Sequence, residues 1–193
     1  MNKRRLSKLE QGQGTTVFGR LLLTRRQCRN LLKWVLLALG YLAVQVLQDV
    51  AISRVRLFGG CPDVTVAYLL LACVLLGPDR GGLFALCAGV FRSLSGAVLG
   101  PVSLTVITIS GVFLSAFRRA YLRRRFRTEL LCCWLGLTVH KAVVYGLGLF
   151  LGYTALARWP SAVGGLVGEM AACALLYPVV NATGNLGGEP WNG

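Results

Sequence analysis

Apolar residues gather in six runs along the chain, each bounded by short polar or glycine-rich stretches. A helix needs roughly 17–25 mainly apolar residues to cross a bilayer. The second run is the shortest, because its continuous apolar part covers only Val64–Gly77, and residues 63–117 also allow a different division. The pattern predicts six transmembrane helices over residues 34–53, 63–78, 81–100, 101–117, 130–154 and 163–182. The predicted fold class is an all-α, polytopic membrane helix bundle.

Basic residues lie mostly in two stretches outside these runs. Residues 1–33 hold nine Lys/Arg, and the connection between the fourth and fifth runs holds six arginines: Arg118, Arg119, Arg123, Arg124, Arg125 and Arg127. Lys and Arg beside membrane spans stay on the cytoplasmic side. With the N-terminus inside, sixteen basic residues are cytoplasmic and only Arg54, Arg56 and Arg158 lie in outer loops. The charge pattern therefore predicts that both termini are cytoplasmic.

Composition supports a membrane protein and argues against a soluble one. The 193 residues are 55% hydrophobic, with a mean hydropathy of +0.62, which is unusual for a water-soluble fold. The net charge of +14 raises the question of nucleic acid, but no recognisable nucleic-acid-binding module accompanies it. Cations beside spans more often contact anionic lipid, at about 1 kcal/mol per residue. We expect no nucleic-acid partner.

The chain divides into three parts. Residues 1–33 form a basic cytoplasmic arm, in which Thr16–Trp34 mixes apolar and cationic positions. This stretch is either an amphipathic helix on the inner membrane surface or an irregular tail. Residues 34–182 form the six-helix transmembrane domain. Residues 183–193 are expected to be a short disordered cytoplasmic tail, and no other region is long enough for a second domain.

Small residues recur along the third predicted helix at helical spacing. They are Gly82, Ala85, Gly89, Ser93, Gly96 and Gly100. Residues three, four or seven apart share one helical face, and in membranes a face of small residues allows neighbouring helices to approach closely. We expect this face to be a packing seam, either within the chain or for a helix of a partner protein.

Ionisable residues also fall inside the predicted spans. They are Asp49, Arg92, His140, Lys141 and Glu169. A charge in the membrane is costly and normally faces the bundle interior with a partner. Arg92 and Lys141 lie at depths in the membrane similar to that of Glu169. We predict an Arg92–Glu169 ion pair, with Lys141–Glu169 as the alternative. A structural role for the pair is favoured over a proton or ion relay for transport. For His140 we expect a polar contact inside the bundle.

Motifs for catalysis, cofactor binding or metal binding are absent from the sequence. It contains no HExxH, GxSxG or Walker loop, and its seven cysteines form no CxxC or Cys/His metal spacing. The turn Gly77–Gly82 lacks the lysine and hydroxyl residue of a phosphate loop, and is typical of a tight cytoplasmic hairpin. We therefore expect a non-enzymatic protein without catalytic, cofactor or metal sites.

One region resembles a known family. Pro62-Asp63 opens an apolar helix, a glycine turn follows, and a glycine-rich helix leads to Ser95-Gly96 and Leu99-Gly100. This arrangement resembles the bacterial rod shape-determining protein MreD family, and the match is specific over residues 62–100. The position of Gln48 before the outer loop, the chain length and the basic connection at 118–127 also fit. The chain departs from the family pattern at Arg92, where an acidic residue is usual.

The resemblance implies a non-enzymatic subunit of the cell-elongation machinery in the bacterial inner membrane. The implied partners are an MreC-like bitopic protein and the complex of a RodA-type polymerase with a penicillin-binding transpeptidase, linked to the MreB cytoskeleton. The implied fold is similar to the six-helix substrate-binding subunits of energy-coupling-factor vitamin transporters. The residues carried over as scaffold or partner-facing positions are Pro62, Asp63, Gly89, Gly96, Leu99 and Gly100, and Gly82 joins them through the small-residue face.

Two alternatives follow from the same features. A substrate-binding subunit of an energy-coupling-factor transporter would share the architecture, but it requires an outward cavity with polar and aromatic ligand contacts. Under the scaffold and the transporter interpretations alike, the arginines of residues 118–127 are expected to contact anionic lipids or cytoplasmic partners. A membrane enzyme is the third reading, and it lacks candidate residues.

Overall fold

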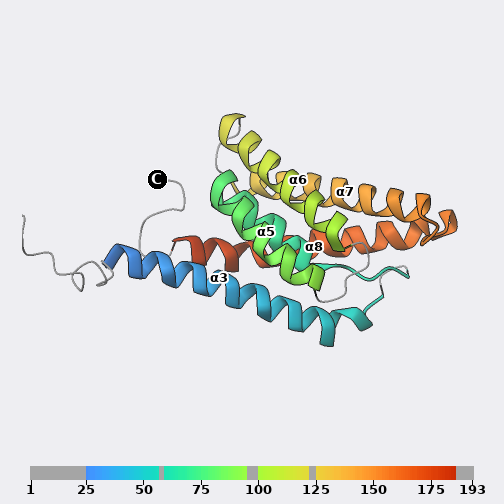
Figure 1. The fold of residues 1–193 in the computed structure, drawn as a ribbon, viewed down its shortest axis with the longest axis horizontal. Coiled ribbons are helices and arrows are strands. Elements are labelled where there is room, and N and C mark those ends of the chain that lie inside the picture. The colour runs from blue at the N-terminus through green and yellow to red at the C-terminus, as the bar shows by residue number, and fades with distance from the viewer. Residues whose placement is uncertain (1–24, 57–58, 95–99, 122–124, 186–193) are drawn as a thin grey trace, which may run out of the picture.

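The described residues of a computed structural model, 25–56, 59–94, 100–121 and 125–185, form a bundle of helices (Figure 1). Within these ranges there are six α-helices and two short 3-10 turns, η1 (Ile52–Arg54) and η2 (Leu156–Arg158). The helices are α3 (Arg25–Val50), α4 (Val64–Leu76), α5 (Pro78–Leu94), α6 (Gly100–Tyr121), α7 (Phe126–Phe150) and α8 (Trp159–Asn185). The predicted all-helical class and the order of six helices are confirmed.

Four stretches are long and apolar enough to cross a membrane. They cover Asn30–Arg54, Gly100–Tyr121, Phe126–Phe150 and Leu156–Thr183. At 1.5 Å per residue each exceeds the roughly 30 Å of a bilayer core. The chain thus has the features of a multi-pass membrane protein.

Several predicted boundaries need correction. Helix α3 begins at Arg25, so residues 25–33 of the predicted arm belong to a helix that continues into the span. Helix α8 continues to Asn185, so residues 183–185 are helical and not part of a disordered tail. Helix α5 ends at Leu94, six residues earlier than predicted. Residues 1–24 and 186–193 lie outside the described residues.

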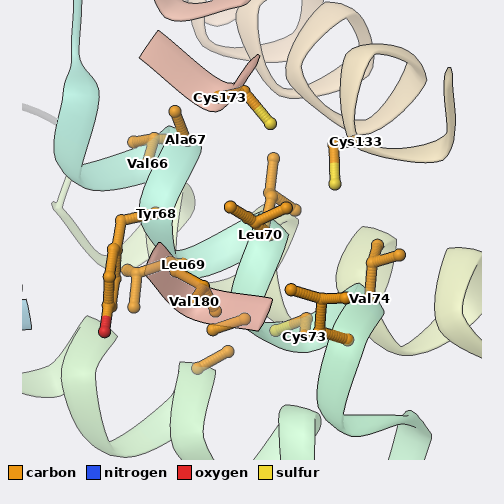
Figure 2. Packing of buried hydrophobic residues seen from close by; sticks show 14 of the residues in the cluster. Val66, Ala67, Tyr68, Leu69, Leu70, Cys73, Val74, Cys133, Cys173 and Val180 are labelled. Carbon is orange, nitrogen blue, oxygen red and sulfur yellow. The ribbon is translucent and has the colours of Figure 1, made fainter. Parts of the chain in front are cut away.

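Helix α4 forms the centre of the bundle. All thirteen of its residues are buried, and the helix touches each of the other five. Figure 2 shows part of this core, in which side chains of α4 lie near Cys133 of α7 and Cys173 of α8. A helix that is apolar on every side is stable only when it is surrounded, which matches the uninterrupted sequence VTVAYLLLACVLL. Its length of about 20 Å is short of the bilayer core. The shortest apolar run therefore supplies the core.

Glycines on the surrounding helices allow them to approach α4 closely. A Cβ atom added at Gly81 would lie 2.6 Å from the carbonyl oxygen of Cys73 and 2.7 Å from its Cα. At Gly111 it would lie 3.0 Å from the Cys73 Sγ, and at Gly136 3.4 Å from Leu70. Small residues at three helix contacts thus bring α5, α6 and α7 against the same central helix.

The small-residue face of α5 packs within the chain. A Cβ added at Gly82 would lie 2.7 Å from Val112 and one at Gly89 3.1 Å from Leu104, both on α6. Ala85 is buried as well. These positions form a packing seam between α5 and α6. Because α6 covers Gly82 and Gly89, these two glycines are not open to the helix of a partner protein, which was the other expectation.

The small-residue positions predicted for one helix are divided between α5 and α6. Gly100 is the first residue of α6, where a Cβ would lie 3.0 Å from the Ser93 Oγ. The expectation that Gly100 lies on the third helix is therefore wrong, because Gly100 belongs to α6. Gly96 and Leu99 lie outside the described residues.

The predicted hairpin between the second and third helices is confirmed. Gly77 has φ +94° and ends α4, and Pro78 begins α5 directly after it. Glycine is favoured at a positive φ because it has no Cβ, and proline is tolerated in the first helical turn because its missing N–H would be unpaired there. This tight turn makes α4 and α5 antiparallel neighbours.

Candidate functional site

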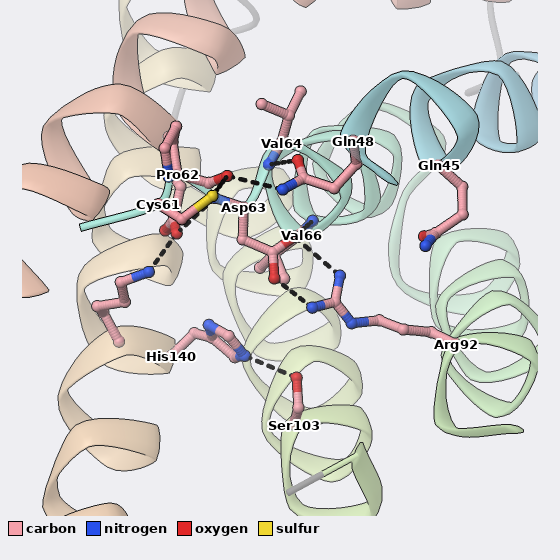
Figure 3. A network of polar contacts seen from close by, with 12 residues as sticks. Gln45, Gln48, Cys61, Pro62, Asp63, Val64, Val66, Arg92, Ser103 and His140 are labelled. Atoms are coloured by element: carbon pink, nitrogen blue, oxygen red, sulfur yellow. Dashed lines mark hydrogen bonds and ion pairs between the residues drawn. The ribbon is translucent and has the colours of Figure 1, made fainter. Parts of the chain in front are cut away.

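A network of charged and polar side chains surrounds the first turn of α4 (Figure 3). Asp63 is the N-cap of this helix, and its Oδ1 accepts a hydrogen bond from the backbone N–H of Val66 at 3.3 Å. An N-cap carboxylate satisfies a free N–H and interacts favourably with the positive end of the helix dipole. The predicted role of Pro62-Asp63 in starting this helix fits the geometry.

Arg92 pairs with Asp63 and not with Glu169. Its Nη1 donates to Asp63 Oδ1 at 2.8 Å, and its Nη2 pairs with Asp63 Oδ2. The predicted Arg92–Glu169 pair is thus wrong. The reason is the hairpin at Gly77: Asp63 precedes it by 14 residues and Arg92 follows it by 15, so the two antiparallel helices place these side chains at the same level.

The rival prediction is confirmed, because Lys141 of α7 pairs with Glu169 of α8. Glu169 is fully buried, and its Oε1 also accepts a hydrogen bond from the backbone N–H of Asp63 at 3.0 Å. Gly165 makes room for the lysine, since a Cβ there would lie 3.2 Å from Lys141 Nζ. One carboxylate therefore joins α7, α8 and the start of α4.

Gln48 connects α3 to the same region. Its Nε2 donates to the carbonyl oxygen of Pro62 at 2.9 Å, and its Oε1 accepts from the N–H of Val64 at 2.9 Å. A side-chain amide that offers one donor and one acceptor to the backbone fixes the entry of α4 at two points. The sequence singled out Gln48 only by its place before the outer loop.

His140 and Ser103 form a separate polar contact between α7 and α6. His140 Nε2 lies 2.9 Å from Ser103 Oγ, and both residues are buried. The predicted polar contact of His140 inside the bundle is confirmed. A serine activated by histidine requires a third group to orient the ring, but His140 Nδ1 has no hydrogen-bond partner among the described residues. The arrangement favours a structural contact between α6 and α7.

Hydrogen bonds and ion pairs thus join five of the six described helices in one network. The participants are Gln48 (α3), the N-cap Asp63 (α4), Arg92 (α5), Lys141 (α7) and Glu169 (α8). The Ser103–His140 contact joins α6 to α7 separately. The two carboxylates and two cations of the network balance in charge. Buried charges need partners to offset the loss of hydration, so the pairing makes this charged centre compatible with an apolar bundle.

A second buried ion pair lies toward the opposite end of the bundle. Arg118 Nη1 contacts Glu129 Oε1 at 2.6 Å, and the Tyr177 hydroxyl donates to Glu129 Oε2 at 2.5 Å. Arg118 and Glu129 are 4% and 0% exposed. The expectation that Arg118 contacts lipid or a cytoplasmic partner is therefore wrong, because the side chain turns inward to join α6, α7 and α8.

The other basic residues of this connection differ in position. Arg119, Arg125 and Arg127 are exposed, which leaves them available for the predicted contact. Arg123 and Arg124 lie outside the described residues. In the described part of the chain, no group of three or more His, Cys, Asp or Glu side chains is arranged to hold a metal ion.

The sequence and structure were compared with known proteins at three levels. No protein-family model, no curated protein and no solved structure matches the chain. The function is therefore argued from the chain's own residues and their geometry.

Proposed function

We propose that this chain is a non-enzymatic, multi-pass scaffold subunit of the bacterial cell-elongation machinery, of the MreD type. It would lie in the inner membrane with both termini in the cytoplasm. The observation that carries the proposal is the charge-balanced network that joins α3, α4, α5, α7 and α8, beside the buried contact that joins α6 to α7. In this network the charges hold the helices together, as expected for a protein whose function is to present a fixed shape.

The region that resembles MreD supports the specific assignment. Pro62-Asp63 opens the central helix, the turn at Gly77 follows, and Gly82 and Gly89 pack closely on α6. The departure at Arg92 also has a physical explanation, because the cation has a carboxylate partner in Asp63. The substitution thus creates no unpaired charge and is compatible with a scaffold fold.

The transporter alternative receives less support. A vitamin-binding subunit needs an outward cavity with polar and aromatic contacts to its ligand. The hollow at the outer end of the bundle is lined, among the described residues, by arginine, serine and small side chains and by no aromatic residue. A scaffold explains the closed, paired interior more directly.

Two kinds of surface would meet partners. The exposed arginines Arg119, Arg125 and Arg127 would lie at the cytoplasmic surface, near anionic lipids and cytoplasmic proteins. The apolar outer faces of the long helices would meet lipid or the single span of an MreC-like protein. The RodA-type polymerase and its transpeptidase are the expected further members of the complex.

Co-purification tests this proposal. We expect a tagged full-length chain, expressed with the MreC-like protein of its own genome and extracted in mild detergent, to retain that protein through affinity and size-exclusion steps. Its depletion in a rod-shaped host should produce rounded cells. An unrelated six-span protein with the same tag is the control. Failure to retain the MreC-like protein, together with unchanged cell shape, would contradict the proposal.

A further inference from the structure

A hollow of about 720 Å³ lies at the outer end of the bundle, where α3 ends and α8 begins. Its described lining comes from two distant parts of the chain: Ser53, Arg56, Gly59 and Cys61 on one side, and Ala157, Arg158, Pro160 and Ser161 on the other. Two arginines about one hundred residues apart in sequence therefore face the same hollow. The charged network of α4 plays no part in its lining.

Close backbone packing holds the two sides of the hollow together. A Cβ added at Gly60 would lie 1.8 Å from the carbonyl oxygen of Ser161 and 3.0 Å from the N atom of Gly165. Only glycine fits at such a distance, so the loop after α3 rests directly on the first turns of α8. The hollow is thus formed by a fixed contact between Gly60 and α8.

The hollow carries an excess of positive charge. Neither Arg56 nor Arg158 forms an ion pair with another described residue. The carboxylates of Asp63 and Glu169, which lie beneath the loop, are already paired with Arg92 and Lys141. That pairing is neutral, so neither carboxylate forms an ion pair with Arg56 or Arg158.

The start of α8 adds to this charge. Pro160 and Ser161, which line the hollow, lie in the first turn of a helix of 27 residues. The Ser161 hydroxyl donates to the carbonyl oxygen of Arg158 at 2.6 Å. The Trp159 N–H donates to the carbonyl oxygen of Leu156 and Pro160 has no N–H, so the positive charge at this end comes from the dipole of the helix and not from its first two N–H groups.

These arginines also lie where membrane topology disfavours them. Short outer loops normally carry few Lys and Arg, and in the predicted topology the outer loops hold only Arg54, Arg56 and Arg158. Two of the three meet in one hollow. Planar guanidinium groups bind the oxygens of phosphate groups through paired hydrogen bonds.

We propose that this hollow binds a phosphate group through Arg56 and Arg158, either on an outer-leaflet lipid headgroup or as a free phosphate anion. The site is independent of the scaffold function proposed above. It would fix a phosphate at the membrane surface, between the loop that leads into α4 and the start of α8.

Three single substitutions, each of which removes one positive charge, test the site in the full chain. We expect Arg56→Gln and Arg158→Gln each to weaken binding about tenfold, since each removes hydrogen bonds to a charged acceptor. Arg54→Gln is the matched control, because Arg54 is a neighbouring outer arginine that does not line the hollow. It should change binding less than twofold.

Two ligands distinguish the sources of the phosphate. Calorimetry of the detergent-solubilised chain with inorganic phosphate, against chloride at equal ionic strength, measures the free anion. Native mass spectrometry after reconstitution with phosphatidylglycerol measures retained lipid. Saturable binding of either ligand that depends on Arg56 and Arg158 supports the site. Binding of neither by the wild-type chain, or an equal loss in Arg54→Gln, overturns it.

Protection of a native cysteine in the wild-type chain tests the site without substitutions, so the result does not depend on whether the variants fold. Cys61 lines the hollow and its thiol is exposed, so a bound phosphate should slow its reaction with a neutral maleimide at least threefold. Phosphatidylglycerol should protect it similarly if the site holds lipid. An unchanged rate with both ligands at concentrations that saturate the measured binding would place that binding elsewhere and overturn the proposal.

Discussion

At the scale of single residues, Asp63 combines three roles at one point. Its carboxylate caps α4, the same carboxylate pairs with Arg92, and its backbone N–H donates to Glu169. A helix start placed in a bilayer would otherwise leave several N–H groups without partners. One residue thereby provides hydrogen bonds at the start of α4 and a counter-charge for the partly buried Arg92.

The Asp63–Arg92 pair makes a prediction about stability. Asp63→Asn keeps a good N-cap but leaves Arg92 without its counter-charge, and Arg92→Met leaves Asp63 without its own. Each should lower the free energy of unfolding by about 3–5 kcal/mol, measured by titration with a denaturing detergent. The double variant should recover most of this loss.

The control for this cycle is Asp49→Asn. Asp49 is exposed and accepts hydrogen bonds from Gln45 only one turn away, so its replacement should change stability by less than about 0.5 kcal/mol. A double variant no more stable than the single ones would show that the two charges do not act as a pair.

The sequence identified the charged residues inside the helices but not all of their partners. Lys141 and Glu169 lie on two helices that are adjacent in sequence, and their similar depths in the membrane were enough to suggest the pair. Arg92 was assigned by depth to Glu169, although Asp63 lies nearer across the hairpin at Gly77. The inward turn of Arg118 toward Glu129 was missed because a run of arginines at a membrane surface usually faces outward.

At the scale of helices, the order of elements was predictable and their packing was not. Periodicity and charge located six helices in the right order, because these signals are local. The central place of α4 depends on contacts with five helices, although its apolar character on every side was a usable sign. The end of α5 at Leu94 was missed because small residues recur at helical spacing beyond it.

Glycine contacts with α4 give a prediction at this scale. Gly81→Ala should lower the free energy of unfolding by about 2–4 kcal/mol, because the new methyl group would meet the backbone of Cys73 within 2.7 Å. Gly146→Ala is the matched control, since Gly146 also lies in a helix and a Cβ there meets nothing within 4 Å. Equal effects of both changes would contradict the proposed close packing.

At the scale of the whole molecule, the arrangement of charge gives the chain a direction in the membrane. Arg119, Arg125 and Arg127 gather at one end of the bundle, and the hollow with Arg56 and Arg158 lies at the other. The bias in basic residues predicts that the first end lies in the cytoplasm. This orientation predicts on which side of the membrane two native cysteines, Cys61 and Cys28, can be labelled.

We expect a membrane-impermeant maleimide to label Cys61 in intact spheroplasts, and Cys28 only after the membrane is opened. Both thiols are exposed. Burial, followed by the nearby Asp63 carboxylate, raises the pKa of the Cys61 thiol, so labelling should accelerate as the pH rises above 8, when more thiolate forms. Cys61→Ser supplies the background, and the reverse pattern would invert the topology.

The enclosed position of α4 has a consequence for how the protein is made. Asp63 leaves the ribosome 106 residues before Glu169, the residue that accepts its N–H, an interval of roughly 5–20 s at ordinary translation rates. During that time α4, which is too short to cross the bilayer, is not yet packed against all of its neighbouring helices. Biogenesis should therefore depend on insertion factors that shelter the unfinished chain, and truncation before α8 should direct it to proteolysis.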